Sequence, residues 1–282
     1  MKKILAAIDF SDCSINAFKH ALSIAKITKS DVEMIWVGKP AAQKDKFIDD
    51  PSDMSKEAKA QLEAMITKYQ PELPETKLTF KIRKGKVYKE IADEAKALKA
   101  FLVVCGTHGA SGFEKFWAGS NANRIVSSCD CPVITIRAGI NIQRSLERIV
   151  LPIDSSPETR QKATFTGFLA KAHGAEIHVL KVYTSKGKVL RGDVDFFAGQ
   201  VSRYLEQEQI PFIVTTVEAE NLSDATIAYA EKVDANLIAI MTDQESAASN
   251  IWMGPYAQQT VNHSPVPVLS IHSRELMTIM TS

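Results

Sequence analysis

The sequence predicts an α/β protein made of two similar domains, each a parallel sheet covered by helices on both faces. Three observations support this prediction. The chain has 282 residues, which is about the length of two average domains. Its second half repeats features of its first half. Each half also alternates short apolar runs with amphipathic segments, a pattern typical of parallel strands joined by helices.

The internal repeat is clearest at the two ends of each half. KKILAAIDFSD, which starts at Lys2, resembles ERIVLPIDSSP, which starts at Glu147, so Asp9 corresponds to Asp154 at an offset of 145 residues. CPVITIR at 131–137 resembles VPVLSIH at 266–272 at an offset of 135 residues. So long a period indicates two domains and excludes a solenoid of short repeats. We predict one domain over residues 1–140 and a second over 146–282, joined by a polar seam.

The elements of the first half follow from local patterns. The run ILAAID has no alternation of apolar and polar residues, as expected of a strand covered on both faces. Ser11 can cap the next helix, whose apolar residues lie mostly on one face. The remaining expected elements are strands at 32–37, 78–85, 101–106 and 133–137, and helices at 55–69, 87–98 and 120–127. This alternation requires parallel strands with right-handed crossovers.

Composition excludes several classes of protein. The formal net charge is +1, which gives no broad electrostatic reason to expect a nucleic acid or an anionic membrane as a partner. Every apolar run is too short to cross a bilayer. The four cysteines form no paired CxxC clusters, so we expect neither a disulfide framework nor a zinc site. A reducing compartment follows, and we expect the cytoplasm.

A glycine-rich stretch, GTHGASGFEKFWAGS at 106–120, follows the fourth expected strand. If the strand order is 3-2-1-4-5, the order reverses between strands one and four, where such sheets bind ligands. Asp9 ends the first strand and Gly106 ends the fourth, so both are expected at this crevice. Glycines allow backbone N–H groups to approach an oxyanion, and a helix start favours negative charge. The alternative is that the glycines only turn the chain and that Ser120 is an ordinary N-cap.

The spacing of this stretch resembles a family motif. Gly106 and Gly109 are separated by two residues, and nine more precede Gly119-Ser120, as in the G-2x-G-9x-G-[ST] signature of ATP-binding universal stress proteins. The Ile-Asp pair that ends the first strand and CPVITI after the loop also match. The chain therefore resembles a tandem universal stress protein. The resemblance implies two Rossmann-like (adenine nucleotide alpha hydrolase-like) domains with five-stranded sheets of order 3-2-1-4-5.

The same resemblance implies a role for each matching residue. Asp9 would accept a hydrogen bond from the adenine amino group, and the backbone of Val37 would frame the base. The ribose and phosphates would be lined by Gly106, His108 and Gly109. The β- and γ-phosphates would be held by Gly119, Ser120 and Asn121. The implied cofactor is ATP, with or without Mg²⁺.

The second half departs from the motif. Aligned on its last strand, Gly119 corresponds to Gly254, Ser120 to Pro255, Gly106 to Met241 and Gly109 to Gln244. Proline has neither an N–H group nor a hydroxyl to offer a phosphate. We therefore expect the second domain not to bind ATP in the family manner, although Asp154 keeps the strand-one carboxylate.

Three functions compete at this point. The first is a nucleotide-responsive regulatory protein of the stress response. The second is an ATP-consuming enzyme, but the chain has no SGGxDS, HxGH or GxxxxGK[ST] motif, so we predict no catalytic or metal-binding residues and at most slow hydrolysis. The third is a scaffold or a binder of an apolar ligand in the second crevice, lined in part by Met241, Trp252 and Met253.

The resemblance also implies partners. Family members commonly pair through strand five, so the two domains are expected to pair with each other through VITIR and VLSIH, which would protect two edge strands. A homodimer and an unidentified protein partner are left open.

Overall fold

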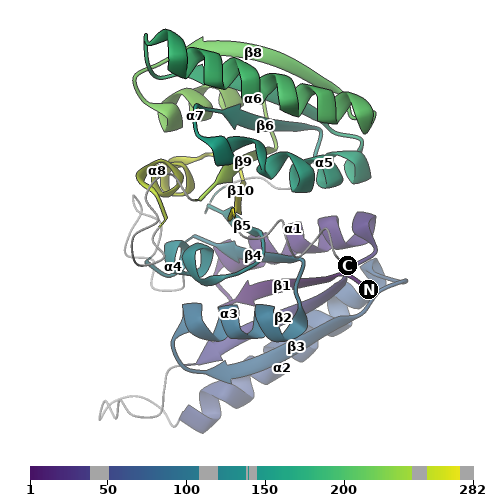
Figure 1. Cartoon of the computed structure of the whole chain (residues 1–282). Coiled ribbons are helices and arrows are strands. Elements are labelled where there is room, and N and C mark those ends of the chain that lie inside the picture. The colour runs from purple at the N-terminus through teal and green to yellow at the C-terminus, as the bar shows by residue number, and fades with distance from the viewer. Residues whose placement is uncertain (39–50, 108–119, 138, 140–144, 243–252, 274–282) are drawn as a thin grey trace. The chain divides into compact units, whose positions relative to one another are not determined.

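The computed structural model describes residues 1–38, 51–107, 120–137, 139, 145–242 and 253–273. The chain divides into two compact units near residues 138 and 139 (Figure 1). In the described residues, no helix is long and apolar enough to cross a membrane.

The first unit is a five-stranded parallel sheet in the order β3-β2-β1-β4-β5, as predicted. Its strands are β1 (Lys3–Ile8), β2 (Asp31–Gly38), β3 (Leu78–Lys84), β4 (Leu102–Gly106) and β5 (Val133–Ile136). Its helices are α1 (Asp12–Thr28), α2 (Pro51–Tyr69), α3 (Val87–Leu98) and α4 (Ser120–Ser128). Only α2 differs clearly from the prediction, because it starts at Pro51, four residues before the expected Ser55. Proline suits the first turn of a helix, where its missing N–H is not needed.

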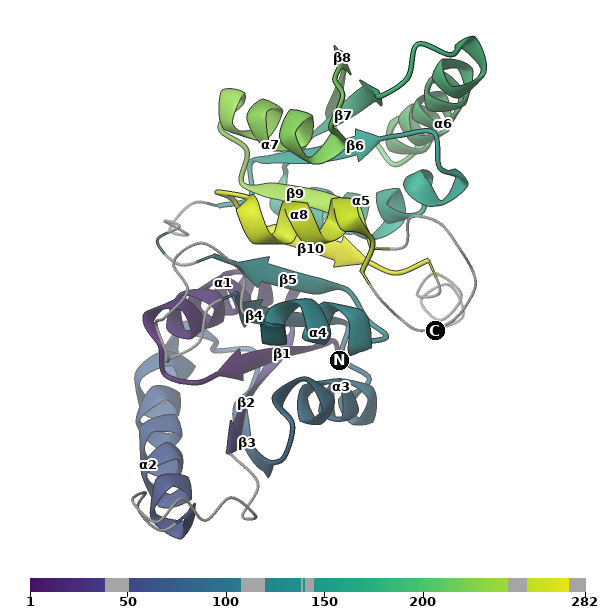
Figure 2. The ribbon, with the colours of Figure 1, turned by 90° about the vertical axis from the view of Figure 1, so that its left-hand side faces the viewer.

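Helices cover both faces of this sheet. On one face α1 packs beside α2, with the rings of Phe18 and Tyr69 edge to face at a centroid distance of 5.3 Å. On the other face α3 packs against α4 (Figure 2). The Ser11 hydroxyl accepts a hydrogen bond from the Ser14 N–H at 3.2 Å, so the predicted N-cap of α1 is confirmed. The central strands β1 and β4 are buried almost throughout, which explains their unbroken apolar runs.

The second unit has the same topology, with parallel strands in the order β8-β7-β6-β9-β10. Its strands are β6 (Arg148–Ile153), β7 (Glu176–Tyr183), β8 (Phe212–Glu218), β9 (Leu237–Met241) and β10 (Val268–Ile271). Its helices are α5 (Lys162–His173), α6 (Lys188–Gln207), α7 (Leu222–Lys232) and α8 (Pro255–His263). A 3₁₀ helix, Pro157–Arg160, precedes α5, whereas α1 has no such segment before it.

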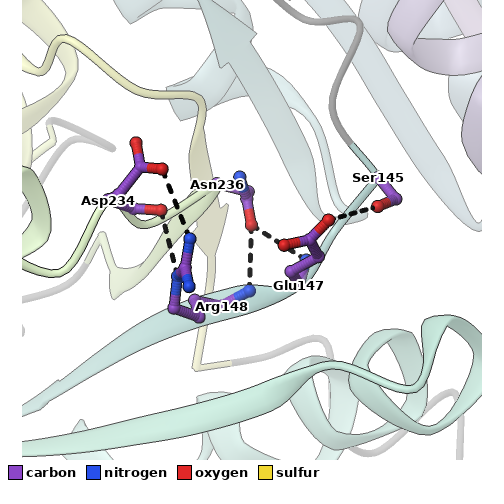
Figure 3. Close-up of polar contacts among 5 residues, drawn as sticks. All are labelled: Ser145, Glu147, Arg148, Asp234 and Asn236. Atoms are coloured by element: carbon purple, nitrogen blue, oxygen red, sulfur yellow. Dashed lines mark hydrogen bonds and ion pairs between the residues drawn. The ribbon is translucent and has the colours of Figure 1, made fainter.

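A polar cluster fixes the start of β6 to the start of β9 (Figure 3). The side-chain oxygen of Asn236 accepts hydrogen bonds from the N–H groups of Glu147 and Arg148, both at 2.9 Å. The Arg148 guanidinium lies 3.3 Å from the carboxylate of Asp234, and Ser145 donates to Glu147 at 3.0 Å. Asn236 is buried, whereas Asp234 is exposed. The amide of Asn236 therefore contributes more to stability than the neighbouring ion pair.

This difference gives a prediction. Asn236→Ala should lower the free energy of unfolding of the second domain by about 1–3 kcal/mol, because two partly buried N–H groups lose their acceptor. Asp234→Ala should change it by less than about 0.5 kcal/mol, because exposed ion pairs contribute little. Urea unfolding of the full chain, with hydrogen exchange of the β6 and β9 amides as the probe, measures the change in free energy of unfolding for each variant. Equal losses in the two variants would contradict the assignment.

Candidate functional site

The carboxyl ends of β1 and β4 lie side by side, since Ala6 pairs with Val104 in the parallel register. Asp9 follows β1 directly and is exposed. Its main-chain N–H donates to the Ser14 hydroxyl at 3.2 Å, and its Oδ1 accepts from the N–H and hydroxyl of Ser11 at 3.0 and 2.6 Å. These bonds hold Asp9 at the entry to α1, with its carboxylate at the solvent boundary.

Gly106 ends β4 against the same helical turn. A Cβ atom at this position would lie 2.7 Å from the Cys13 sulfur, closer than real Cβ atoms come, and 3.2 Å from the Ser14 nitrogen, which is a tight contact. Glycine is therefore required here so that α1 can approach the sheet. Asp9 and Gly106 both flank Ser14, so two residues nearly a hundred positions apart in the sequence meet at one helix start.

The other predicted site residues are only partly described. Val37 lies near the end of β2 and is half-buried; Trp36, the residue before it, pairs with Ile8, so Val37 is at the same sheet edge as Asp9. Ser120 begins α4 as predicted, and Asn121 is exposed in its first turn. His108, Gly109 and Gly119 lie outside the described residues, so no geometry for them enters the site.

A charged cluster lies beside Val37. Its register partner on β3, Arg83, donates from Nε to the carboxylate of Glu94 on α3 at 2.9 Å and makes a second bond to the same oxygen. Glu94 is almost fully buried. Burial, followed by the charge of Glu94, raises the pKa of Glu33, and the bond to Glu94 raises the pKa of Arg83. The ion pair of Arg83 with Glu94 links β3 to α3, and the carboxylate of Glu33 on β2 lies close enough to Glu94 for the two charges to interact.

The second unit repeats the arrangement around Asp9, in which an aspartate follows the first strand and is bonded to hydroxyl groups of the next turn; we call this arrangement the acidic corner. Asp154 follows β6, its Oδ1 accepts from the Ser156 N–H at 2.8 Å, and its own N–H donates to the Thr159 hydroxyl at 3.2 Å. Asp154, Ser156 and Thr159 stand at the same 145-residue offset from Asp9, Ser11 and Ser14. The Asp-and-hydroxyl geometry is therefore common to both domains, and it alone does not distinguish them.

Behind this corner the second unit contains a buried lysine. Lys162 is 2% exposed, and its ammonium donates to the carbonyl and hydroxyl oxygens of Thr159 at 2.7 and 3.0 Å. Burial lowers the pKa of Lys162 to about 8, and the negative charge of Asp154 partly opposes that change. The equivalent residue of the first unit is Ala17, which is also buried. A cation in the second unit thus occupies a place that is apolar in the first.

The start of α8 is also closed by internal contacts. The N–H of Gly254, the counterpart of Gly119, donates to the Thr242 carbonyl at 3.1 Å. Pro255 has no N–H and begins the helix. Tyr256, the counterpart of Asn121, is buried, and its burial together with the charge of Asp154 raises the pKa of its phenol. At the start of α8, internal groups therefore use the Gly254 donor and the space around Tyr256.

Sequence reasoning did not single out Lys162 or Tyr256. An isolated lysine in an amphipathic helix is predicted to be a surface residue, because lysine is rarely buried. The signal that could have found both was the repeat itself, which aligns Lys162 with Ala17 and Tyr256 with Asn121. Of the three residues expected to line an apolar crevice, Met241 and Met253 are 2% and 8% exposed and offer little surface to a ligand. The third, Trp252, lies outside the described residues.

A shallow hollow lies in the second unit, lined by Ser155 after β6, by the end of β7 and by the start of α6. The guanidinium carbon of Arg191 lies there 4.9 Å from the centre of the Tyr183 ring, and Nη1 of the same guanidinium lies 2.9 Å from the carboxylate of Glu218. The charge of this arginine is thus already matched by an internal partner. Within the described part of the chain, no group of three His, Cys, Asp or Glu side chains could hold a metal ion.

Comparisons with known proteins agree with the fold. The model of the universal stress protein family matches residues 1–137 and 145–272. A universal stress protein of Methanocaldococcus jannaschii is 33% identical over 143 residues, which are 48% of this chain and 82% of the relative. The universal stress protein YxiE of Bacillus subtilis is 27% identical over 147 residues, 48% of this chain and 98% of the relative. The crystal structure of a universal stress protein from Archaeoglobus fulgidus covers 96% of this chain and 98% of its own, with a TM-score of 0.79 and 20% identity.

These matches confirm the resemblance on which the sequence prediction depended. The family model covers both halves of the chain, and the Archaeoglobus fulgidus structure has the same fold over nearly the whole length. The chain therefore belongs to the universal stress protein family, a family of stress-response proteins, and carries the family's domain twice.

Proposed function

We propose that the first domain binds ATP at the carboxyl ends of β1 and β4, and that its nucleotide state regulates a protein partner in the stress response. The observation that carries the proposal is the meeting of Asp9 and Gly106 around Ser14 at the point where the strand order reverses. Ligands of open parallel sheets bind at this reversal. The exposed carboxylate of Asp9 can accept a hydrogen bond from the purine amino group there.

The remaining contacts follow from the family motif. The backbone of Val37 frames the base, and Gly106, His108 and Gly109 line the ribose and phosphates. The N–H groups and the hydroxyl at the start of α4, from Gly119, Ser120 and Asn121, hold the β- and γ-phosphates, where the helix dipole favours negative charge. Mg²⁺ accompanies the nucleotide and offsets its charge.

The second domain does not bind ATP in this manner. Its acidic corner is present, but the N–H of Gly254 already has an acceptor, Pro255 has no donor, and Tyr256 is buried near Asp154. The ammonium group of Lys162 donates its hydrogen bonds to the carbonyl and hydroxyl oxygens of Thr159. The apolar-ligand alternative is less well supported, since Met241 and Met253 are buried.

The protein is proposed as a binder and not as an enzyme, with ATP hydrolysis slow or absent. No catalytic residue is assigned, because the motif supplies backbone donors and no general base. Pairing of the two domains through β5 and β10 and a cytoplasmic location remain proposals, as does the identity of the protein partner.

The repeat supplies a matched pair of variants for the test. Asp9→Ala should weaken ATP binding by about tenfold or more, which is 1.4 kcal/mol or more, because the adenine amino group loses a charged acceptor. Asp154→Ala removes the same acidic corner from the second domain and should leave ATP affinity unchanged. Isothermal titration calorimetry of the full chain with ATP and Mg²⁺ should show one site per chain in the wild type.

Two results would contradict the proposal. Absence of ATP binding to the wild type would remove the proposed function and leave the fold. Two sites per chain, or an equal loss in Asp154→Ala, would show that the second domain binds nucleotide as well. Because each substitution also removes the hydrogen bonds to Ser11 or Ser156, near-ultraviolet circular dichroism of both variants checks that the fold is unchanged.

A further inference from the structure

Strand β8 leaves one side of the second sheet without a strand neighbour among the described residues. It pairs with β7 along its whole length, and within the part of the chain that the structure describes nothing pairs with its other side. Ile213 and Val214 are 41% and 47% exposed. Successive residues of a strand point to opposite faces, so apolar surface is open on both faces beside this edge.

The homologous edge strand of the first domain is different. In the parallel registers Val32 pairs with Leu78 and Ile177 pairs with Phe212, so β3 and β8 align residue by residue. The charged residues of β3 are Lys81, Arg83 and Lys84, and the corresponding residues of β8 are Thr215, Val217 and Glu218. Charged side chains on an edge strand discourage pairing with another chain. The first domain has this protection in the centre of its edge strand, and the second domain lacks it.

We propose that β8 pairs antiparallel with β8 of a second copy of this chain, centred on Thr215. Antiparallel pairing of two identical edge strands has a two-fold axis perpendicular to the sheet, so one residue faces its own copy. With Thr215 at the centre, Ile213 faces Val217 of the second copy and Val214 faces Thr216. These opposed β-branched side chains stabilise a sheet, and no two like charges are opposite each other.

The sequence of β8 favours a second copy over other occupants because the strand is complementary to itself. The same pairing applied to β3 would place Lys81 opposite Lys81 of the other chain, which is destabilising. The β8 edge is also held in shape from within its own domain. The Thr215 hydroxyl lies 3.0 Å from the Tyr229 hydroxyl, which lies 3.1 Å from Nδ1 of the buried His178. The edge is therefore ordered before it pairs, which reduces the entropic cost of association.

The test is the mass of the full chain by sedimentation equilibrium over a concentration series. The wild type should reach twice the 31.1 kDa of one chain. Thr215→Lys and Thr215→Glu should each return to the mass of one chain, because like charges then face each other. A mixture of the two variants should recover the dimer. Lys81→Glu, the matched change on β3, should leave the wild-type mass unchanged.

A second pair of variants avoids the hydroxyl network of Thr215. Val214 and Thr216 are exposed and face each other across the proposed pair. Val214→Lys with Thr216→Lys should abolish the dimer, whereas Val214→Lys with Thr216→Glu should retain it. A wild type that stays at one chain at its highest soluble concentration overturns the proposal. A dimer that persists in Thr215→Lys and in the double-lysine variant also overturns it, because the interface then lies elsewhere.

Discussion

Lys162→Met is expected to raise the free energy of unfolding of the second domain by about 2 kcal/mol at pH 7. The ammonium of Lys162 is buried, and burial lowers its pKa from 10.5 to about 8. A change of that size corresponds to a cost of roughly 3 kcal/mol for keeping the charge in the folded domain. Methionine has a similar length and carries no charge, but it loses the two bonds to Thr159, which offset about 1 kcal/mol.

The pH dependence of the wild type follows from the same pKa. Between about pH 8 and 10.5 the unfolded chain holds the Lys162 proton and the folded domain releases it. The unfolded state therefore binds more protons, and the free energy of unfolding rises with pH across this window. In Lys162→Met that rise should disappear, so the two proteins should become more similar in stability towards pH 10.

Native-state hydrogen exchange of the β6 and β7 amides measures this change for the second domain alone. Lys171→Met is the control, since Lys171 lies on the same helix but is exposed in an ion pair with Glu208 at 3.1 Å. It should change stability by less than about 0.5 kcal/mol. A loss of stability in Lys162→Met would mean that the ammonium is needed as a bonding partner for the acidic corner, and the argument from burial would be wrong.

The two domains share the geometry of the acidic corner but differ in the residue packed behind it. Both place an aspartate after the first strand and fix it through hydroxyl groups of the following turn. The first domain leaves apolar Ala17 behind this corner, whereas the second has Lys162 there, with a cost in stability. Under the proposed function, one domain then responds to nucleotide and the other does not.

The sequence predicted the architecture well because parallel strands and their helices leave regular patterns. The unbroken apolar runs became the buried strands β1 and β4, and Ser11 became the N-cap of α1. The start of α2 was misplaced because the preceding Pro51 reads as part of a loop, although proline is tolerated in a first helical turn. Local patterns carry this information, so tertiary contacts were not needed to read it.

The candidate site was predictable only in part. Asp9 and Gly106 were expected at one crevice, and both lie beside Ser14, but the contact that favours glycine at 106 is the approach of Cys13 and Ser14. That requirement depends on helix packing, which no spacing of residues in the sequence reports. The burial of Lys162 and Tyr256 was missed for a similar reason, since burial of a polar side chain is decided by the elements packed around it.

Arg83→Met should lower the free energy of unfolding of the first domain by about 2–3 kcal/mol at pH 8. Arg83 is the cation that bonds to the carboxylate of Glu94, whose side chain is 4% exposed. Loss of one partner leaves a buried charge without compensation, which is more costly than loss of an exposed pair. The value is at the lower end for buried pairs because the Arg83 side chain itself is 41% exposed.

The loss should become smaller as the pH falls. Without Arg83, the charges of Glu33 and Glu94 interact with no guanidinium bonded to Glu94, and burial and the charge of Glu94 already raise the pKa of Glu33. The folded variant then binds a proton that the unfolded chain lacks above its ordinary glutamate pKa of 4.5. Its stability therefore falls as the pH rises through the raised pKa and returns as the pH falls.

Hydrogen exchange of the β2 and β3 amides at pH 5 and pH 8 measures both effects. Glu33→Gln in the Arg83→Met background should restore part of the stability at pH 8, because one of the two carboxylates is removed. Lys84→Met, the neighbouring exposed residue of β3, is the control and should change stability by less than about 0.5 kcal/mol. A loss in Arg83→Met that is equal at both pH values would show that the aliphatic packing of Arg83, and not its charge, holds β3 and α3 together beside Val37.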